Sequence, residues 1–117
     1  ICFLGVTFKA NTDDMRDSSS LEMIPHLSKQ GAKIKYYDPT GYKDEFKKIK
    51  NVNFSNSISD AVKSADLVIL HTEWNDFKSI NFKKLHPSTN LKIYDMRNIF
   101  SSGKIKSQGF KYFGIGR

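Results

Sequence analysis

Short apolar segments alternate with longer segments of mixed character along the 117-residue chain. Six of the apolar segments have the length and composition of strands: ICFLGV (1–6), AKIKYYD (32–38), VNFSN (52–56), DLVILHT (66–72), LKIYDMR (91–97) and FKYFGIG (110–116). The first and the fourth are apolar almost throughout, which is typical of strands that are buried on both faces of a parallel sheet. VNFSN is the weakest of the six.

The first intervening segment, residues 18–31, carries the clearest helix pattern. Leu21, Ile24 and Leu27 share one face of a helix with 3.6 residues per turn. The serines at its start predict an N-cap, with Glu22 near the capping-box position, and Gly31 is a typical C-terminal stop. Pro25 lies inside this helix, where a kink is possible because proline cannot donate a backbone hydrogen bond.

The remaining segments predict a short helix at 42–50, a helix at 58–65 after a Ser57 cap, an irregular segment or short helix at 74–87, and a short helix at 101–109. Strands and helices thus alternate along the chain. This alternation, with right-handed crossovers, predicts a single-domain α/β fold: a Rossmann-like, doubly wound parallel sheet with helices on both faces.

Size and composition restrict the function further. The net charge is +7, from 19 Lys and Arg against 12 Asp and Glu, and the lysines are spread along the chain. A solvated, lysine-rich surface explains this better than nucleic-acid binding, which stays an alternative that rests on charge alone. Because the lysines form no basic stripe, we expect no nucleic-acid partner. No apolar run approaches the roughly 20 residues that span a bilayer, so we expect no membrane partner either.

The single cysteine and the first residue also carry information. Cys2 excludes an internal disulfide framework, fits a reducing, cytoplasmic compartment, and is expected to be a core thiol. The chain opens at Ile1 inside an apolar strand, so we expect it to be a fragment of a longer protein.

Ligands of open α/β sheets bind beyond the carboxyl ends of the strands, so the residues that follow each strand are candidates for a site. Phe8, Lys9 and Arg16 follow the first strand, and Arg97 follows the fifth. Only three arginines occur in the chain, and two of them lie here. Because the guanidinium fork matches phosphate and carboxylate, we expect an anion-binding edge, with a nucleotide phosphate as the leading ligand.

Each candidate has a simpler interpretation. Lys9 could be a solvated loop residue, and Arg16 could pair with Asp13 or Asp14, which are more typical of a structured turn than of a metal site. Trp74 after the fourth strand is more often a packing residue than a stacking platform. His71 and Glu73 lack a third ligand, so no metal site is predicted. No catalytic motif and no G-x-G-x-x-G turn is present, since the turn after the first strand is long, polar and charged.

That turn, GVTFKANTDDMRDSSS (5–20), strongly resembles the start of the C-terminal domain of the UDP-glucose/GDP-mannose dehydrogenase family. The resemblance continues through GAKIKYYDP, SADLVILHTEWNDF and YDMRNIF to the terminal GIGR, and so covers essentially the whole chain. One departure is Ser19, where proline or alanine is frequent nearby in the family; this is expected to affect entry into the helix more than ligand chemistry.

The resemblance implies a function and roles for residues. The family oxidises the C6 alcohol of a nucleotide sugar to a carboxylate in two NAD-dependent steps. Phe8, Lys9 and Arg97 match positions that contact the UDP-sugar, and Arg16 matches an arginine that reaches toward NAD. The motifs after the fourth and fifth strands are most similar to those of the members that oxidise UDP-glucose. GDP-mannose and UDP-N-acetylhexosamine dehydrogenases remain alternatives.

The resemblance also implies that residues 1–117 are the C-terminal UDP-sugar-binding domain of a larger dehydrogenase. An N-terminal NAD-binding domain and a central helix that supports a homodimer would precede it. The nucleophilic cysteine would lie upstream of Ile1, so no catalytic residue is assigned to this chain and the fragment alone is expected to be inactive. A non-enzymatic receiver-like signalling module is a further alternative, because Asp13 and Asp14 follow the first strand.

Overall fold

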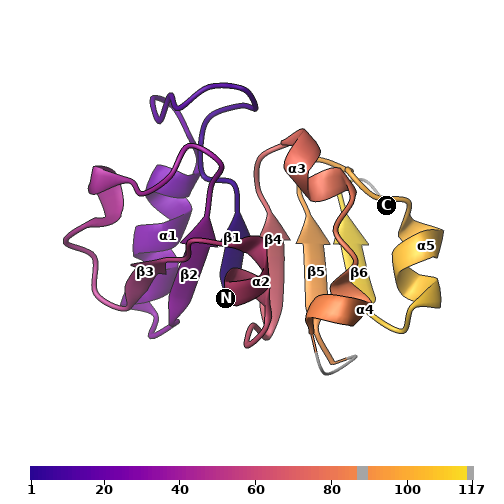
Figure 1. Ribbon diagram of the computed structural model, residues 1–117. Coiled ribbons are helices and arrows are strands. Elements are labelled where there is room, and N and C mark those ends of the chain that lie inside the picture. Colours follow the sequence, from indigo (N-terminus) through magenta and orange to yellow (C-terminus); the bar gives the residue numbers. More distant parts are fainter. Residues whose placement is uncertain (87–89, 116–117) are drawn as a thin grey trace.

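The fold is built around one six-stranded sheet, whose strands lie side by side in Figure 1. The computed structural model describes residues 1–86 and 90–115. All strand pairs are parallel, and the order is β3-β2-β1-β4-β5-β6. The strands are β1 (Cys2–Leu4), β2 (Ile34–Tyr37), β3 (Val52–Phe54), β4 (Leu67–Leu70), β5 (Lys92–Asp95) and β6 (Lys111–Gly114).

This order is the doubly wound Rossmann arrangement that the sequence predicts. It differs from the 2-1-3-4-5 order of flavodoxin-like folds, which receiver modules share, and so excludes the receiver-like alternative.

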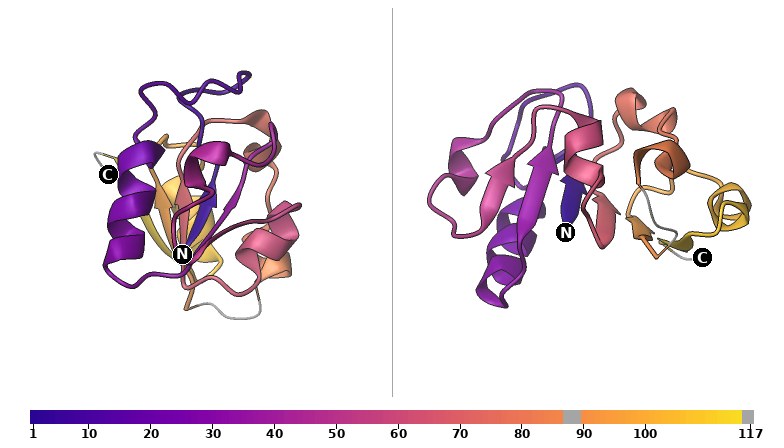
Figure 2. Two further views of the ribbon diagram at one scale, coloured as in Figure 1. Left: turned by 90° about the vertical axis from the view of Figure 1, so that its left-hand side faces the viewer. Right: turned by 60° about the horizontal axis from the view of Figure 1, so that its bottom comes forward.

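Helices cover both faces of the sheet, but unequally. α1 (Ser20–Lys29) and the 3₁₀-helix η1 (Asp44–Phe46) pack on one face, and α2 (Ile58–Val62), α3 (Asn75–Lys78), α4 (Phe82–Leu85) and α5 (Ser102–Ser107) pack on the other. The left view of Figure 2 shows α1 and α2 on opposite sides of the strands. None of these helices has the length and apolar composition needed to cross a membrane.

Alternation along β1 divides the core between the two faces. Phe3 lies in the cluster under α1 with Ile24 and Ile69, whereas Cys2 and Leu4 lie in the larger cluster under the other helices. Since α1 covers only the first part of the sheet, its face is left open over β5 and β6. The register partners Tyr94 and Phe113 are accordingly 40% and 49% exposed there.

α1 ends as the sequence predicts but begins differently. Gly31 has φ +95°, its N–H donates to Ser28 O at 3.0 Å, and Ala32 N–H donates to Leu27 O at 3.1 Å. This is a Schellman motif. The helix runs through Pro25.

A serine, Ser19, is at the N-cap of α1 as predicted, but its hydroxyl accepts no helical N–H; Ser18 Oγ accepts Ser20 N–H at 3.3 Å. Ser18 and Ser20 instead each donate to Val6 O at 2.6 Å, tying the start of the helix to the chain that leaves β1. The cap predicted for α2 is confirmed, since Ser57 Oγ accepts Asp60 N–H at 3.0 Å.

Two other segments differ in detail from the prediction. Residues 42–50 hold only the single turn η1, in which Phe46 is the buried anchor. Residues 74–87 hold two separate short helices, α3 and α4. Part of this segment and the last two residues of the terminal GIGR motif lie outside the described residues.

Candidate functional site

The order of the strands changes direction between the neighbours β1 and β4, which is the topological switch point where open α/β sheets bind ligands. The chain leaving β1 runs to α1 on one face, and the chain leaving β4 runs to α3 on the other. Figure 1 shows the long loop after β1 standing above the carboxyl ends of the strands. We call residues 8–17 the β1 loop.

The two chains touch directly at the switch point. Gly5 has φ +80°, and a Cβ built on it would lie 2.5 Å from Thr72 Cβ, so no larger residue fits there without displacing β4 or β1. The Thr72 hydroxyl donates to Thr7 O at 2.9 Å. All three residues bring the chains after β1 and β4 into one rigid junction.

His71, which immediately follows β4, is part of the same junction and is 1% exposed. Its Nδ1 lies 3.0 Å from Thr72 Oγ1, and its Nε2 lies 2.8 Å from Ser19 Oγ. The only proton of the Thr72 hydroxyl is used on Thr7 O, so this oxygen accepts from His71 Nδ1–H. When the ring is neutral, His71 Nε2 is unprotonated and accepts the Ser19 hydroxyl proton.

The surroundings of His71 favour the neutral imidazole. Burial, followed by the positive charge of Arg97, lowers the pKa of His71 from 6.5 to about 4. His71 is therefore uncharged near neutral pH and acts as a structural bridge between the chains.

Arg97 follows β5 and reaches back across the edge to both switch-point chains. Its Nε–H donates to His71 O at 3.0 Å, and Nη2 donates to Phe8 O at 3.4 Å, a weaker contact. In residues 1–86 and 90–115, no carboxylate forms an ion pair with this guanidinium. The charge is thus held by neutral carbonyls and is free to meet an anion from solvent, because Arg97 is exposed.

The turn after Arg97 holds it in that position. Asn98 has φ +53°, and its side-chain amide forms two hydrogen bonds of 3.0 Å with the backbone of Ile115, just after β6. Asp95 accepts the backbone N–H of Arg97 at 3.2 Å. Asp95 is fully buried and also accepts the Tyr112 hydroxyl, so it is a structural residue and not a ligand.

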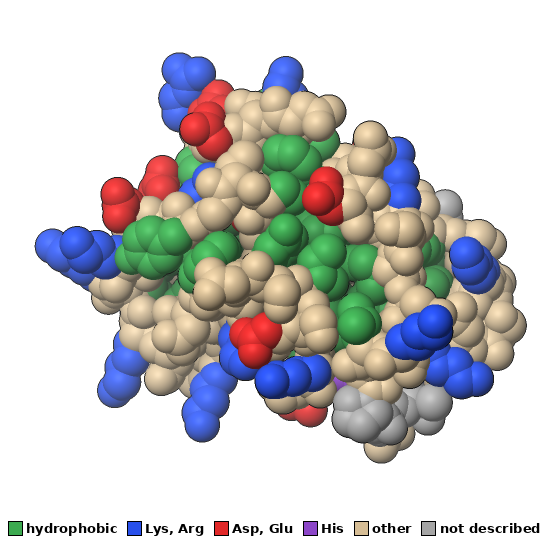
Figure 3. Space-filling view, in the orientation of Figure 1, with side chains coloured by type: hydrophobic (Ala, Val, Ile, Leu, Met, Phe, Trp, Pro, Cys, Tyr) green, Lys and Arg blue, Asp and Glu red, His purple; other side chains and the backbone are tan. Residues whose placement is uncertain are grey.

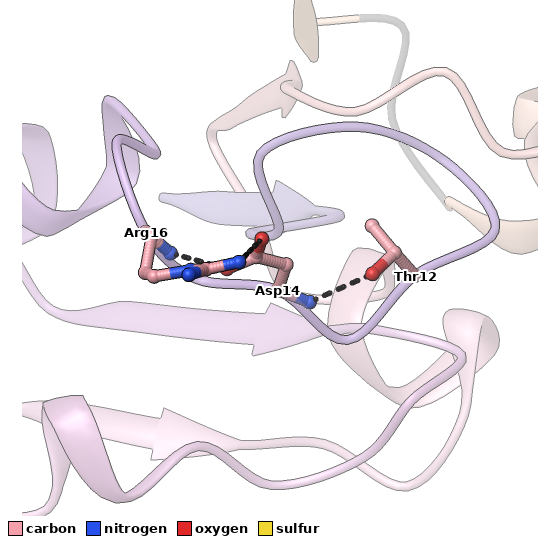
Figure 4. A network of polar contacts seen from close by, with 3 residues as sticks. All are labelled: Thr12, Asp14 and Arg16. Carbon is pink, nitrogen blue, oxygen red and sulfur yellow. Dashed lines mark hydrogen bonds and ion pairs between the residues drawn. The ribbon is translucent and has the colours of Figure 1, made fainter.

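Arg16 lies in the β1 loop and, unlike Arg97, is paired with a carboxylate. Its Nε and Nη2 donate to the two carboxylate oxygens of Asp14 at 3.1 and 3.0 Å, and Asp14 also accepts Arg16 N–H (Figure 4). Thr12 Oγ1 accepts Asp14 N–H at 3.2 Å. The hydrogen bonds from Arg16 lower the pKa of Asp14. Of the two predicted acidic partners, Asp14 is the one that pairs with Arg16 and shapes the turn.

Phe8 and Lys9 lie at the start of the β1 loop, and both are exposed. Phe8 N–H donates to Asp14 O at 2.9 Å, which closes the loop, and the Thr7 hydroxyl donates to Lys9 O at 2.9 Å. The structure therefore places all four predicted residues at one edge of the sheet. It brings Arg97 into contact with Phe8, whereas the side-chain hydrogen bonds of Arg16 go to Asp14 in its own loop.

A buried network after β2 supports the same edge. Asp38, 1% exposed, accepts Val6 N–H at 2.9 Å and Thr40 N–H at 2.9 Å. The buried Lys43 ammonium donates to the Thr40 hydroxyl, and the Tyr36 hydroxyl accepts Lys43 N–H at 2.8 Å. Asp38 therefore fixes the exit of β1 from the side opposite to β4.

Other sequence candidates take structural places. Trp74 is 8% exposed and packs in the larger core cluster, which favours the packing interpretation. Cys2 is fully buried in β1, and burial raises its pKa to about 12, so it is a core thiol without thiolate character at neutral pH. On the face drawn in Figure 3, Lys and Arg side chains project around the rim and do not form one basic stripe.

Sequence reasoning missed the residues that assemble this edge. His71 was considered only as a weak metal candidate, and the roles of Thr72 and Ser19 were not foreseen. Their contacts join residues 52 and 65 positions apart in the chain, and no local pattern signals such pairs.

Comparison with known proteins identifies the family of this chain. The profile described as "UDP-glucose/GDP-mannose dehydrogenase family, UDP binding domain" matches residues 2–102. UDP-glucose 6-dehydrogenase of Rhizobium meliloti is 36% identical over 118 aligned positions, which cover 100% of this chain and 27% of that protein. UDP-glucose 6-dehydrogenase TuaD of Bacillus subtilis is 33% identical over 121 residues, which cover 100% of this chain and 26% of that protein.

A solved structure has the same fold: the NDP-N-acetyl-D-galactosaminuronic acid dehydrogenase of Methanosarcina mazei, with a TM-score of 0.83 and 28% identity over 98% of this chain and 24% of that one. This chain thus spans about a quarter of the length of the relatives it matches. Because the family profile covers most of it, the chain belongs to the UDP-glucose/GDP-mannose dehydrogenase family, in which it corresponds to the UDP-binding domain.

Proposed function

We propose that this chain is the UDP-sugar-binding domain of an NAD-dependent UDP-glucose 6-dehydrogenase, which oxidises UDP-glucose to UDP-glucuronate in two steps with two NAD. The observation that carries the proposal is Arg97. Its guanidinium is fixed by the carbonyls of His71 and Phe8 at the switch point and has no carboxylate partner in the described part of the chain. A pyrophosphate is the ligand that such a fork fits.

Phe8 and Lys9 complete the proposed substrate contacts. Lys9 is a second exposed cation, and it is the neighbour of Phe8, whose carbonyl Arg97 contacts. The two cations follow different strands, β1 and β5, but lie at the same edge of the sheet. Phe8, 45% exposed at the same point, offers an apolar surface next to them. Two cations beside an exposed ring suit a ligand with both phosphates and less polar parts.

We assign Arg16 to the cofactor side. Its side chain is 88% exposed and is carried outward by the β1 loop, so it can reach a ligand that is bound mainly by another part of the protein. NAD and an N-terminal NAD-binding domain belong to this proposal, which the greater length of the relatives supports. The homodimer and the cytoplasmic location stay predictions.

The binding role is tested by calorimetric titration of the chain with UDP. Arg97→Ala and the matched control Lys104→Ala each remove one positive charge, but Lys104 is an exposed residue of α5. Loss of a charge-assisted hydrogen bond predicts a Kd about tenfold or more weaker for Arg97→Ala, with the control unchanged. Equal weakening in both variants would show a net-charge effect only and would contradict the assignment.

The choice of sugar is tested with the complete protein. UDP-glucose should yield two NADH per molecule consumed, and GDP-mannose and UDP-N-acetylhexosamines should yield none. Turnover of GDP-mannose without turnover of UDP-glucose would move the chain to another branch of the family. For the cofactor assignment, Arg16→Ala should raise the KM for NAD more than the KM for the sugar nucleotide.

A further inference from the structure

Three consecutive serines at the start of α1 have different partners. Ser18 and Ser20 both donate to Val6 O, so they return to the chain that leaves β1. The Ser19 hydroxyl instead contacts His71 Nε2 at 2.8 Å, on the chain that leaves β4. Of the three, Ser19 alone links the residues that follow the β1 loop to the chain that leaves β4.

His71 receives this link and also holds Arg97. Its backbone N–H donates to Leu4 O at 3.0 Å, which anchors residue 71 beside the end of β1. Its carbonyl accepts Arg97 Nε–H at 3.0 Å, while its imidazole contacts Ser19 and Thr72. The orientation of this one residue therefore depends on both chains at the switch point.

We propose that His71 is a positioning residue that couples the β1 loop, which carries Lys9 and Arg16, to Arg97, with the Ser19–His71 hydrogen bond as the link. The proposal rests on the proposed function, because the benefit of the coupling is a preformed anion site. It adds two residues, His71 and Ser19, that do not touch the ligand.

The physical reason lies in the cost of ordering the site. The β1 loop is largely exposed, with Met15 as its buried residue, and of the three serines that follow it Ser19 alone bonds to the chain that leaves β4. When that link is present, the far end of the loop and the His71 residue whose carbonyl holds Arg97 are joined before UDP arrives. When it is absent, part of the binding free energy is used to order the loop, so affinity falls although no ligand contact is removed.

The matched pair Ser19→Ala and Ser28→Ala tests the coupling in this chain. Both serines belong to the α1 region and have one side-chain hydrogen bond, but Ser28 Oγ donates to Lys50 O at the opposite end of the helix. Ser19→Ala should weaken the Kd for UDP by about three- to tenfold, the loss of one hydrogen bond. Ser28→Ala should leave the Kd unchanged, and Ser19→Thr, which keeps the hydroxyl, should restore it. An unchanged Kd in Ser19→Ala overturns the proposal.

A readout without ligand separates this proposal from the proposed function. NMR exchange of the Arg97 Nε–H proton with water reports its bond to His71 O. Ser19→Ala should accelerate this exchange at least threefold while the backbone amides of β4 keep their wild-type rates. If wild type binds no UDP but this acceleration is found, the coupling stands and the proposed function fails. If exchange is unchanged, the coupling is refuted whatever UDP does.

Discussion

The buried, neutral state of His71 predicts a specific loss of stability in mild acid. Protonation would put a second N–H on Nε2, which now accepts the Ser19 hydroxyl, and would place a cation near Arg97. The perturbation is therefore a fall in pH, and the reference is the variant His71→Gln, which keeps a polar side chain but does not titrate. His26 and His86 are present in both proteins, so their contributions cancel.

The sign and size follow from the shift of the His71 pKa. The folded-state pKa of about 4 lies below the ordinary 6.5, so the unfolded chain binds the proton more readily. The stabilising contribution is complete above pH 6.5 and is lost progressively as the pH falls toward 4. Two-state linkage gives a loss of about 2 kcal/mol between pH 7 and pH 5, and about 3 kcal/mol over the whole window.

Urea denaturation at pH 7, 6 and 5, followed by circular dichroism, measures this contribution. The free energy of unfolding of wild type minus that of His71→Gln should fall by about 2 kcal/mol from pH 7 to pH 5. The interval stops at pH 5 because most carboxylates titrate below it. A difference that stays constant across the interval would refute the neutral, buried His71 and with it the tautomer assigned to the bridge.

The remaining predictions concern positions of positive φ. Gly5→Ala combines a φ of +80° with a Cβ placed 2.5 Å from Thr72 Cβ, so it should lower the free energy of unfolding by about 3 kcal/mol in urea titrations. Gly31→Ala, at φ +95° with open space around it, should lose only about 1 kcal/mol; equal losses would show that crowding at Thr72 does not matter. Asn98→Ala should lose about 2 kcal/mol in the same assay, from strain and two bonds to Ile115, and Asn98→Gly about half of that; the reverse order would contradict this account.

The strands were the most predictable part of this fold. A buried parallel strand is a continuous apolar run, so the local sequence is enough to predict strands such as the one in segment 66–72. The surface segment 42–50 was not predictable in the same way. Its apolar residues fit a helix, but Phe46 reaches the core from a single turn, and tertiary burial decided its structure.

The place of the candidate cations at one edge of the sheet was predictable, but the contacts that hold them were not. The rarity of arginine made Arg16 and Arg97 conspicuous, and the switch-point rule placed them at one edge. Whether a guanidinium is free or paired depends on its neighbours in space, which sequence does not show: Arg16 pairs with Asp14, while Arg97 rests on carbonyls. The serines at 18–20 match a helix cap by type, yet their hydroxyls bond to Val6 and His71.

The occupied backbone amides at this edge support the proposal that side-chain cations bind the ligand. In a glycine-rich nucleotide-binding turn, free N–H groups after the first strand and at the helix start point at the pyrophosphate. Here the N–H of Gly5 donates to Tyr37 O, that of Val6 to the Asp38 carboxylate, and that of Phe8 to Asp14 O.

The start of α1 is closed in the same way. The N–H groups of Leu21 and Glu22 donate to the carbonyls of Ser18 and Ser19, so the helix terminus presents few free donors. Because these backbone N–H groups already have acceptors within the protein, few of them are left to bind an anion. In the proposed site, the positive charge for a nucleotide therefore comes from the exposed side chains of Arg97 and Lys9.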